Sequence, residues 1–253
     1  MKNKKVIIAA LLSLILIFTV AVSSTRAVGA FVQSNVADEL TTVSLTGVTA
    51  GNLIVLWVKW EGTTTGGATV SDGTTSLTMG TLSDPGDNTV GQFAYLLSAN
   101  GGNKTYTVTF PTGATFPRLR IAEFSYSGTI SLDAQNIGSG DSAAPASGNI
   151  TTTGTDEIVL GGFSESALVT LSSPLINASA ATFVVGGVHT KMWYRIVTST
   201  FTGNASATSD TSSFWVSNVI AFKIASASGA VTKAKVIING AKVFINGSKM
   251  IVN

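Results

Sequence analysis

The stretch TTVSLTGVTAGNLIVLWVKW, residues 41–60, holds a Thr-rich strand, a turn with a glycine, and a core strand of isoleucine, valine and leucine. The stretch NITTTGTDEIVLGGF, residues 149–163, repeats that order. Further similar pairs follow in the same succession: residues 94–110 with 193–209, and 119–128 with 216–226. The chain is therefore predicted to contain two half-units with the same order of strands.

Strand signals recur throughout the chain after residue 30. Short runs of valine, isoleucine, threonine and aromatic residues alternate with turn-forming clusters, and no segment keeps a helical period over a window of about eleven residues. Half-units that each expose an apolar face bury it by stacking. We expect an all-β fold, one antiparallel β-sandwich domain over 31–228 with halves 31–137 and 149–228, joined by a flexible or extended segment 138–148.

The C-terminal residues 229–253 are predicted to form a separate ribbon. The sequence KAKVIINGAKVFINGSKMIVN, residues 233–253, contains two Asn-Gly pairs, which favour two-residue hairpin turns. The expected register pairs Val236 with Val243 and Val243 with Met250. A ribbon of this size is marginal alone, so it needs a surface to pack on. One side alternates lysines with apolar residues and is the predicted docking surface: Lys235, Ile237, Lys242, Phe244, Lys249 and Ile251.

Residues 1–30 are typical of a secretory signal peptide. Three lysines precede an apolar run from Val6 to Val22, and small residues suited to cleavage follow, with the cut expected after Ala30. An uncleaved membrane anchor is the alternative, because the run is close to the length of a membrane span. The protein is therefore expected to be secreted or cell-surface, with no membrane span in the mature chain.

Charge is unevenly distributed along the chain. Residues 31–228 hold seven basic and thirteen acidic residues, a net charge of −6, whereas the ribbon carries +4. The alkaline isoelectric point of about 8.9 reflects the two ends of the chain and does not indicate a nucleic-acid partner. A basic end on an acidic body predicts head-to-tail attraction at low salt, with a merely solvated lysine face as the alternative.

Composition also favours contact with a partner. The chain has no cysteine, so an exported protein of this sequence relies on core packing and assembly for its stability. Only 11% of the residues are charged and the mean hydropathy is +0.41. Such a surface is unusual for a free domain. The expected partner is a second copy or another cell-surface component, with a glycan as the alternative.

The segments GNLIVLWVKW, AYLLSANGGNKTYTVTF and SNVIAFKIA, with the sequence between them, resemble the jelly-roll-like β-sandwich modules of secreted and cell-surface proteins and of some viral structural proteins. The resemblance covers about residues 31–226 and leaves the ribbon outside. It implies adhesion, carbohydrate binding or scaffolding outside the cell, and it offers no catalytic motif.

Catalytic signals are scarce. His189 is the single histidine, and its place at the edge of a strand favours a structural role over catalysis or zinc binding. Glycosidase chemistry needs two facing carboxylates, and no spacing selects such a pair. Acidic residues gather in turns, which Asp and Asn favour anyway. The alternative there is a calcium ion held by Asp84, Asp87 and Asn88; no other cofactor is expected.

Three tryptophans alternate in phase with polar neighbours. Trp57 shares a strand face with Lys59, Trp193 with Lys191 and Arg195, and Trp215 with a serine. Such tryptophans serve as stacking platforms for sugar rings or as anchors of a subunit interface. The other interpretation is that a covering strand or loop buries them.

The leading hypothesis is a non-enzymatic structural protein that assembles or attaches at the cell surface by β-strand addition, through the ribbon or through the N-terminal segment Phe31 to Val36. The second is a carbohydrate-binding module or adhesin that uses Trp57, Trp193 and Trp215. The third is a secreted hydrolase with a dispersed carboxylate pair.

Overall fold

A computed structural model describes residues 29–62, 66–86, 89–166, 170–185 and 189–226 of the chain, together with the backbone of 236–239, 242–245 and 248–250. Every strand pair in these ranges is antiparallel. The expected all-β antiparallel sandwich class is therefore confirmed. The predicted signal peptide lies outside the described residues except for Gly29 and Ala30, which begin the first strand, so the expected cut after Ala30 falls inside that strand.

The first half folds into two facing sheets. Its inner sheet has the order β1-β8-β3-β6-β5, with β1 (Gly29–Asp38), β8 (Thr115–Tyr126), β3 (Leu53–Glu61), β6 (Thr89–Leu96) and β5 (Thr78–Ser83). Its outer sheet has the order β2-β7-β4, with β2 (Thr42–Val48), β7 (Gly102–Thr109) and β4 (Thr69–Ser71).

The second half repeats this arrangement. Its inner sheet has the order β14-β15-β11-β18-β9, with β14 (Thr182–Val185), β15 (Thr190–Val197), β11 (Glu157–Glu165), β18 (Ser213–Ala225) and β9 (Thr129–Ser142). Its outer layer contains two small sheets, β13-β12-β17 and β10-β16, with β13 (Ser179–Ala180), β12 (Leu171–Ile176), β17 (Ala205–Ser209), β10 (Ile150–Thr151) and β16 (Thr202–Gly203). When β3 is matched with β11, and β8 with β18, the two inner sheets have the same strand order.

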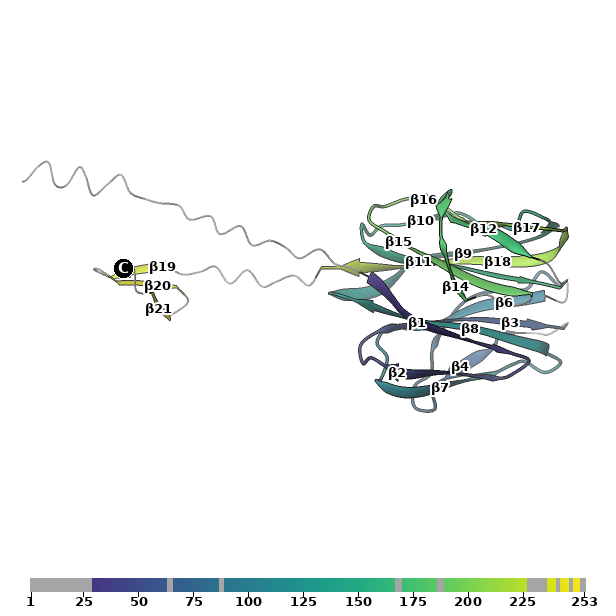
Figure 1. Ribbon diagram of the computed structural model, residues 1–253, viewed down its shortest axis with the longest axis horizontal. Coiled ribbons are helices and arrows are strands. Elements are labelled where there is room, and N and C mark those ends of the chain that lie inside the picture. Colours follow the sequence, from purple (N-terminus) through teal and green to yellow (C-terminus); the bar gives the residue numbers. More distant parts are fainter. Residues whose placement is uncertain are drawn as a thin grey trace, which may run out of the picture.

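The four layers enclose three apolar cores. Figure 1 shows the layers stacked, with β2, β7 and β4 on one side and β10, β16, β12 and β17 on the other. The first core lies between the outer and inner sheets of the first half, the second between the two inner sheets, and the third between the inner and outer layers of the second half. Each half is thus itself a two-layer sandwich, and the two halves stack through their inner sheets.

The expected joint at 138–148 is wrong. Residues 138–142 belong to β9, which pairs with β18 along its length, including Trp215 with Gly140. The glycines there permit close contact: a Cβ on Gly140 would lie 2.9 Å from the Trp215 ring, and one on Gly138 would lie 2.2 Å from the Ala146 carbonyl oxygen. The halves meet instead at the short turn between β8 and β9, where Gly128 has a φ of 107° that suits glycine.

A β-bulge occurs in the corresponding edge strand of each half. In β1, Val32 is the extra residue opposite β8, and in β9, Asp133 is the extra residue opposite β18. A bulge re-aims a side chain relative to the sheet. This feature places the carboxylate of Asp133 at the candidate site described below.

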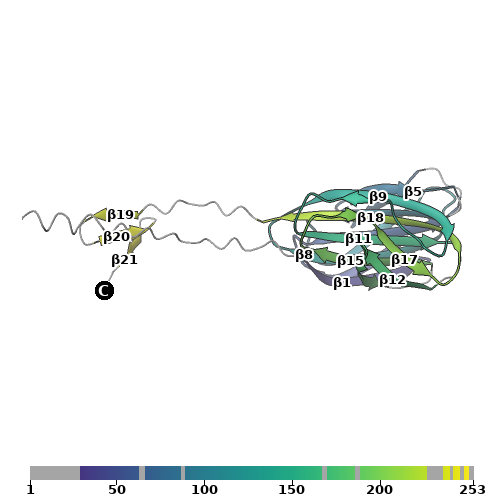
Figure 2. The same cartoon turned by 90° about the horizontal axis from the view of Figure 1, so that it is seen from above.

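The strands run between two ends of the sandwich, visible in Figure 2. The terminal pole is the end at which the described body begins and finishes: a Cβ on Gly29 would lie 3.0 Å from Ile224, and Thr129 pairs with Ala225. The loop pole is the opposite end, where β1, β3 and β11 finish and where Glu61 pairs with Thr89 and Ser213 with Ser142.

The ribbon is a separate three-stranded sheet of β19 (Val236–Asn239), β20 (Lys242–Ile245) and β21 (Ser248–Met250). In its second hairpin Val243 pairs with Met250, as predicted. In the first, Val236 pairs with Ile245 rather than Val243, so the predicted register is wrong by two residues.

Candidate functional site

The three tryptophans predicted as platforms are buried. Trp57 and Trp193 have no exposed surface and Trp215 is 8% exposed. Each indole donates a hydrogen bond inside the fold: Trp57 Nε1 to the Phe163 carbonyl at 3.0 Å, Trp193 Nε1 to the Leu175 carbonyl at 3.3 Å, and Trp215 Nε1 to Ser142 Oγ at 3.2 Å. The stacking-platform hypothesis is wrong for these residues, because inner strands are covered by a layer on both faces.

The two basic residues predicted beside them lie on the same strand, β15. Arg195 Nη1 donates to the Ile176 carbonyl of β12 at 3.1 Å. Lys191 is partly buried; burial, and next the charge of Arg120, lower its pKa, while Glu165 opposes this shift. The Arg195 side chain therefore belongs to a contact within the molecule, and Lys191 is partly enclosed by it.

The predicted calcium loop is described only in part. Asp84 Oδ1 accepts a hydrogen bond from the Gly86 amide at 3.1 Å, the local contact expected of an aspartate in a turn. Asp87 and Asn88 lie outside the described residues. In the described part of the chain, no three His, Cys, Asp or Glu side chains gather as a metal site.

The remaining predicted residues lie at the margins of the fold. His189 immediately precedes β15 at the loop pole, has a φ of 61°, and its carbonyl accepts a hydrogen bond from the Glu165 amide at 3.0 Å. Of the predicted docking residues, Ile237 lies in β19, Lys242 and Phe244 in β20, and Lys249 in β21, whereas Lys235 and Ile251 lie outside the described residues.

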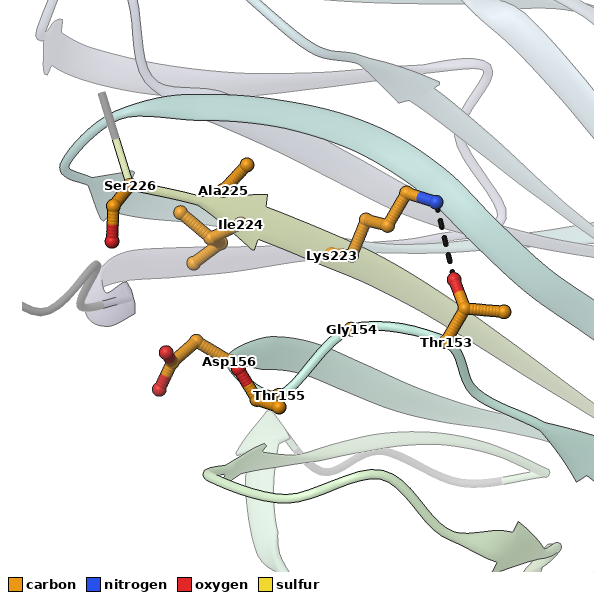
Figure 3. A pocket seen from close by; sticks show the side chains of 8 residues that line it. All are labelled: Thr153, Gly154, Thr155, Asp156, Lys223, Ile224, Ala225 and Ser226. Atoms are coloured by element: carbon orange, nitrogen blue, oxygen red, sulfur yellow. Dashed lines mark hydrogen bonds between the residues drawn. The ribbon is translucent and has the colours of Figure 1, made fainter. Parts of the chain in front are cut away.

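The structure reveals a pocket at the terminal pole that the sequence did not indicate. It is an open cavity of about 320 Å³ between the β10–β11 turn and the end of β18. Figure 3 shows the side chains of Asp156 and Lys223 at its margin, with Lys223 directed at Thr153. Ala225 and Ser226, the last described residues of the body, complete the lining. The pocket therefore adjoins the point from which the chain continues towards the ribbon.

A buried carboxyl pair lies behind this pocket. The carboxyl groups of Asp133 and Glu157 lie beside each other, close enough to share a proton. Both are buried, since the Asp133 side chain is only 2% exposed and Glu157 is fully buried. The Asp133 carboxylate accepts hydrogen bonds from the amide and hydroxyl of Thr153 and lies 3.2 Å from Lys223 Nζ. Glu157 Oε1 accepts a hydrogen bond from the Gly154 amide at 2.9 Å.

The two carboxyls have pKa values far apart. Burial, and then the hydrogen bond and charge of Asp133, raise the pKa of Glu157 to about 8. Burial also acts against ionisation of Asp133, but the hydrogen bonds from Thr153, Glu157 and Lys223 outweigh it and lower its pKa to about 2. At neutral pH, Glu157 therefore holds a proton that it donates to the Asp133 carboxylate.

This arrangement can store a proton, but it does not present one to a substrate. A glycosidase needs two carboxyls separated by a sugar-sized space, whereas these two contact each other beneath the surface. One sequence signal could have found the pair: Glu157 is an acid directly before the apolar run that begins at Ile158. Asp133 gave no such signal, because the bulge that aims it appears only once β9 is paired with β18.

A second group of charges lies at the loop pole, between the halves. Lys59 and Arg120 are fully buried. Lys59 pairs with Glu61 on its own strand, and burial lowers the pKa of Lys59 against the opposing effect of Glu61. Arg120 Nη2 lies 2.8 Å from Asp38 Oδ1, and its Nε donates to the Thr190 carbonyl of the second half at 3.3 Å. The contact of Arg120 with Thr190 ties the two inner sheets together.

No family model, curated protein or solved structure gives a significant match to the chain. Within the described ranges, no helix has the length and apolar composition that a membrane crossing requires. The resemblance to jelly-roll-like modules stays a prediction.

Proposed function

We propose that this is a non-enzymatic extracellular structural protein, a β-sandwich subunit that assembles or attaches at the cell surface by strand addition through its C-terminal ribbon. The observation that carries the proposal is the position of the chain ends. A Cβ on Gly29 would lie 2.7 Å from Ile158 and 3.0 Å from Ile224, so the predicted export segment and the ribbon both continue from one pole, and the opposite pole is available for a different contact.

The ribbon provides a means of pairing. Its order β19-β20-β21 leaves β19 and β21 as edge strands, and edge backbone groups pair with another strand without a strict sequence requirement. The N-terminal alternative has less support, because Phe31 to Val36 already pairs with β8. Side chains also bridge β1 to β2: Asn35 Nδ2 donates to the Ser44 carbonyl at 2.8 Å and Gln33 Nε2 to the Thr46 carbonyl at 3.0 Å.

The interior of the body supports a structural role over catalysis or glycan binding. Burial of Trp57, Trp193 and Trp215 removes the observation on which the carbohydrate-binding alternative depended. The carboxyl pair of Asp133 and Glu157 is buried and partnered inside the fold, so it does not form the separated pair that a hydrolase would need.

Deletion of Lys233 to Asn253 tests the proposal. The body has three cores of its own and should stay folded, with a melting temperature close to that of the full chain. We expect the truncated protein to be monomeric by sedimentation velocity under conditions in which the full chain assembles. Val243→Pro is the matched control for strand pairing, since it keeps all four lysines but removes an amide donor from the central strand. Assembly of the truncated chain at full strength would show that the ribbon is not the docking element.

A further inference from the structure

We propose that the loop pole carries the surface that receives the ribbon of a second copy, an acidic patch formed by Asp84, Asp141 and Asp210 around the exposed ring of Phe214. This inference rests on the proposed function, because it names the surface on which the ribbon docks. It joins copies head to tail.

Exposed acidic residues are concentrated at one end of the molecule. In the described ranges the exposed acids are Asp38, Glu39, Asp84, Asp141 and Asp210, and all five lie where strands start or finish at the loop pole. The basic residues described at this pole, Lys59, Arg118, Arg120 and Lys191, are buried or half-buried. The surface at this end is therefore acidic, whereas the ribbon, which continues from the opposite end, carries +4.

Three of these acids form the patch. Asp38 and Glu39 lie within 4 Å of Arg118 at the β1–β8 corner. Asp84, Asp141 and Asp210 accept hydrogen bonds from neutral donors, the Gly86 amide, Ser212 Oγ and the Thr170 amide. Neutral donors leave the negative charge of the carboxylate in place, so these three acids attract a cation more strongly than the ion-paired corner does.

Strand pairing brings the patch together. Phe214, 46% exposed, pairs directly with Asp141 across β18 and β9. The hydrogen bond from Ser212 to Asp141 brings the loop that contains Asp210 beside them. Asp84 follows the end of β5, which is held against β18 by the hydrogen bond from Asn218 Nδ2 to the Thr81 carbonyl at 3.1 Å.

The ribbon has a matching chemistry. Its sequence alternates Lys235, Lys242 and Lys249 with Ile237, Phe244 and Ile251. Protein interfaces commonly combine an apolar or aromatic centre with charged residues around it. The apolar contact contributes affinity, and the charges orient the partners and raise the association rate.

Chain length favours a second copy as the source of the ribbon. The nine residues between Ser226 and β19 span at most about 36 Å. The strand β18, from Ser213 to Ala225, covers about 40 Å. Even a fully extended linker would therefore bring only the start of the ribbon near the patch on its own chain, whereas a second copy can present its whole ribbon without a stretched linker. A contact between unlike surfaces on successive copies repeats as an open filament unless the rotation closes a ring.

The test compares two full-length double variants with the same change in net charge. Asp141→Asn with Asp210→Asn removes two patch charges, while the control, Glu39→Gln with Asp156→Asn, removes two charges outside the patch. Sedimentation velocity at low salt should give a self-association constant about three- to ten-fold weaker for the patch variant and within two-fold of wild type for the control. Equal weakening in both, or in neither, would overturn the proposal.

Mixing separates this inference from the proposed function. The ribbon-deleted chain keeps the patch, and the patch variant extended by Phe214→Ala keeps the ribbon. Each alone should associate weakly or not at all, and together they should form a heterodimer and nothing longer. If ribbon deletion abolishes assembly but the extended patch variant assembles like wild type, the ribbon docks elsewhere and the inference fails alone. If ribbon deletion leaves assembly unchanged, the proposed function fails as well.

Discussion

A carboxyl group buried beside a second carboxyl keeps its proton at a pH where exposed acids have lost theirs. The folded pKa of Glu157, about 8, lies above its ordinary value of 4.5. The stability that this proton gives is therefore complete below about pH 4.5 and is lost as the pH rises through about 8. Asp133 acts in the opposite sense: with a folded pKa of about 2 against 3.8, its contribution is complete above about pH 4 and is lost as the pH falls towards 2.

The first prediction at the residue scale concerns Glu157→Gln. The glutamine still accepts from Gly154, and its amide donates to Asp133 where the shared proton did. Ionisation of Glu157 should lower the wild-type free energy of unfolding by roughly 2 to 4 kcal/mol between pH 5 and pH 9. In the variant, most of this pH dependence of the free energy of unfolding should be absent. Urea unfolding at several pH values measures it, with Asp156→Asn as the control. An unchanged pH profile in the variant would contradict the shared proton.

At the scale of the element, β9 decides where one half ends and the next begins. A four-residue Gly-Ser insertion after Ser127 lengthens the turn between β8 and β9 and should cost about 1 kcal/mol or less, because loop closure entropy grows slowly with length. The same insertion after Gly138 interrupts the pairing of β9 with β18 and should cost roughly 3 kcal/mol or more.

Thermal and urea unfolding of the two insertion variants compares them directly. The order of stability would be reversed if residues 138–148 were a flexible joint. Far-ultraviolet circular dichroism checks that each variant keeps its strands before the comparison is made.

At the scale of the whole molecule, the core between the inner sheets makes the two halves interdependent. Leu160 of β11 is fully buried in this core, together with Val55, Phe93 and Phe124 of the first half. Leu160→Ala should destabilise the protein by about 2 to 5 kcal/mol and reduce hydrogen-exchange protection in both halves, within a single unfolding transition.

Val70→Ala serves as the matched comparison, because Val70 lies in the first half's outer core and contacts none of the second half's core. If the halves unfold as one, this substitution also lowers protection in the second half. Two separate transitions, or loss of protection confined to the first half, would show that the halves are independent domains.

Local patterns in the sequence determined much of the fold. The alternation of β-prone runs with turn residues defined the strand class, and the paired motifs of residues 41–60 and 149–163 fall on equivalent strands, β2 and β3 in one half, β10 and β11 in the other. The ribbon's second hairpin was predicted to the residue. These features depend on neighbours in the chain, so they can be read from the sequence.

Only the tertiary structure decided what covers each face of a strand. The alternation along β3 placed Trp57 beside Lys59 on a polar face, yet both are fully buried because a second sheet packs on that face and supplies their partners. The tertiary structure likewise decided the position of Asp133, because a bulge directs its side chain at Glu157. It also brought Asp84, Asp141 and Asp210 to one pole, through pairing between strands that are distant in the sequence. Local propensity specifies strands and turns; burial, proton sharing and charge clustering depend on long-range contacts that form only when the layers stack.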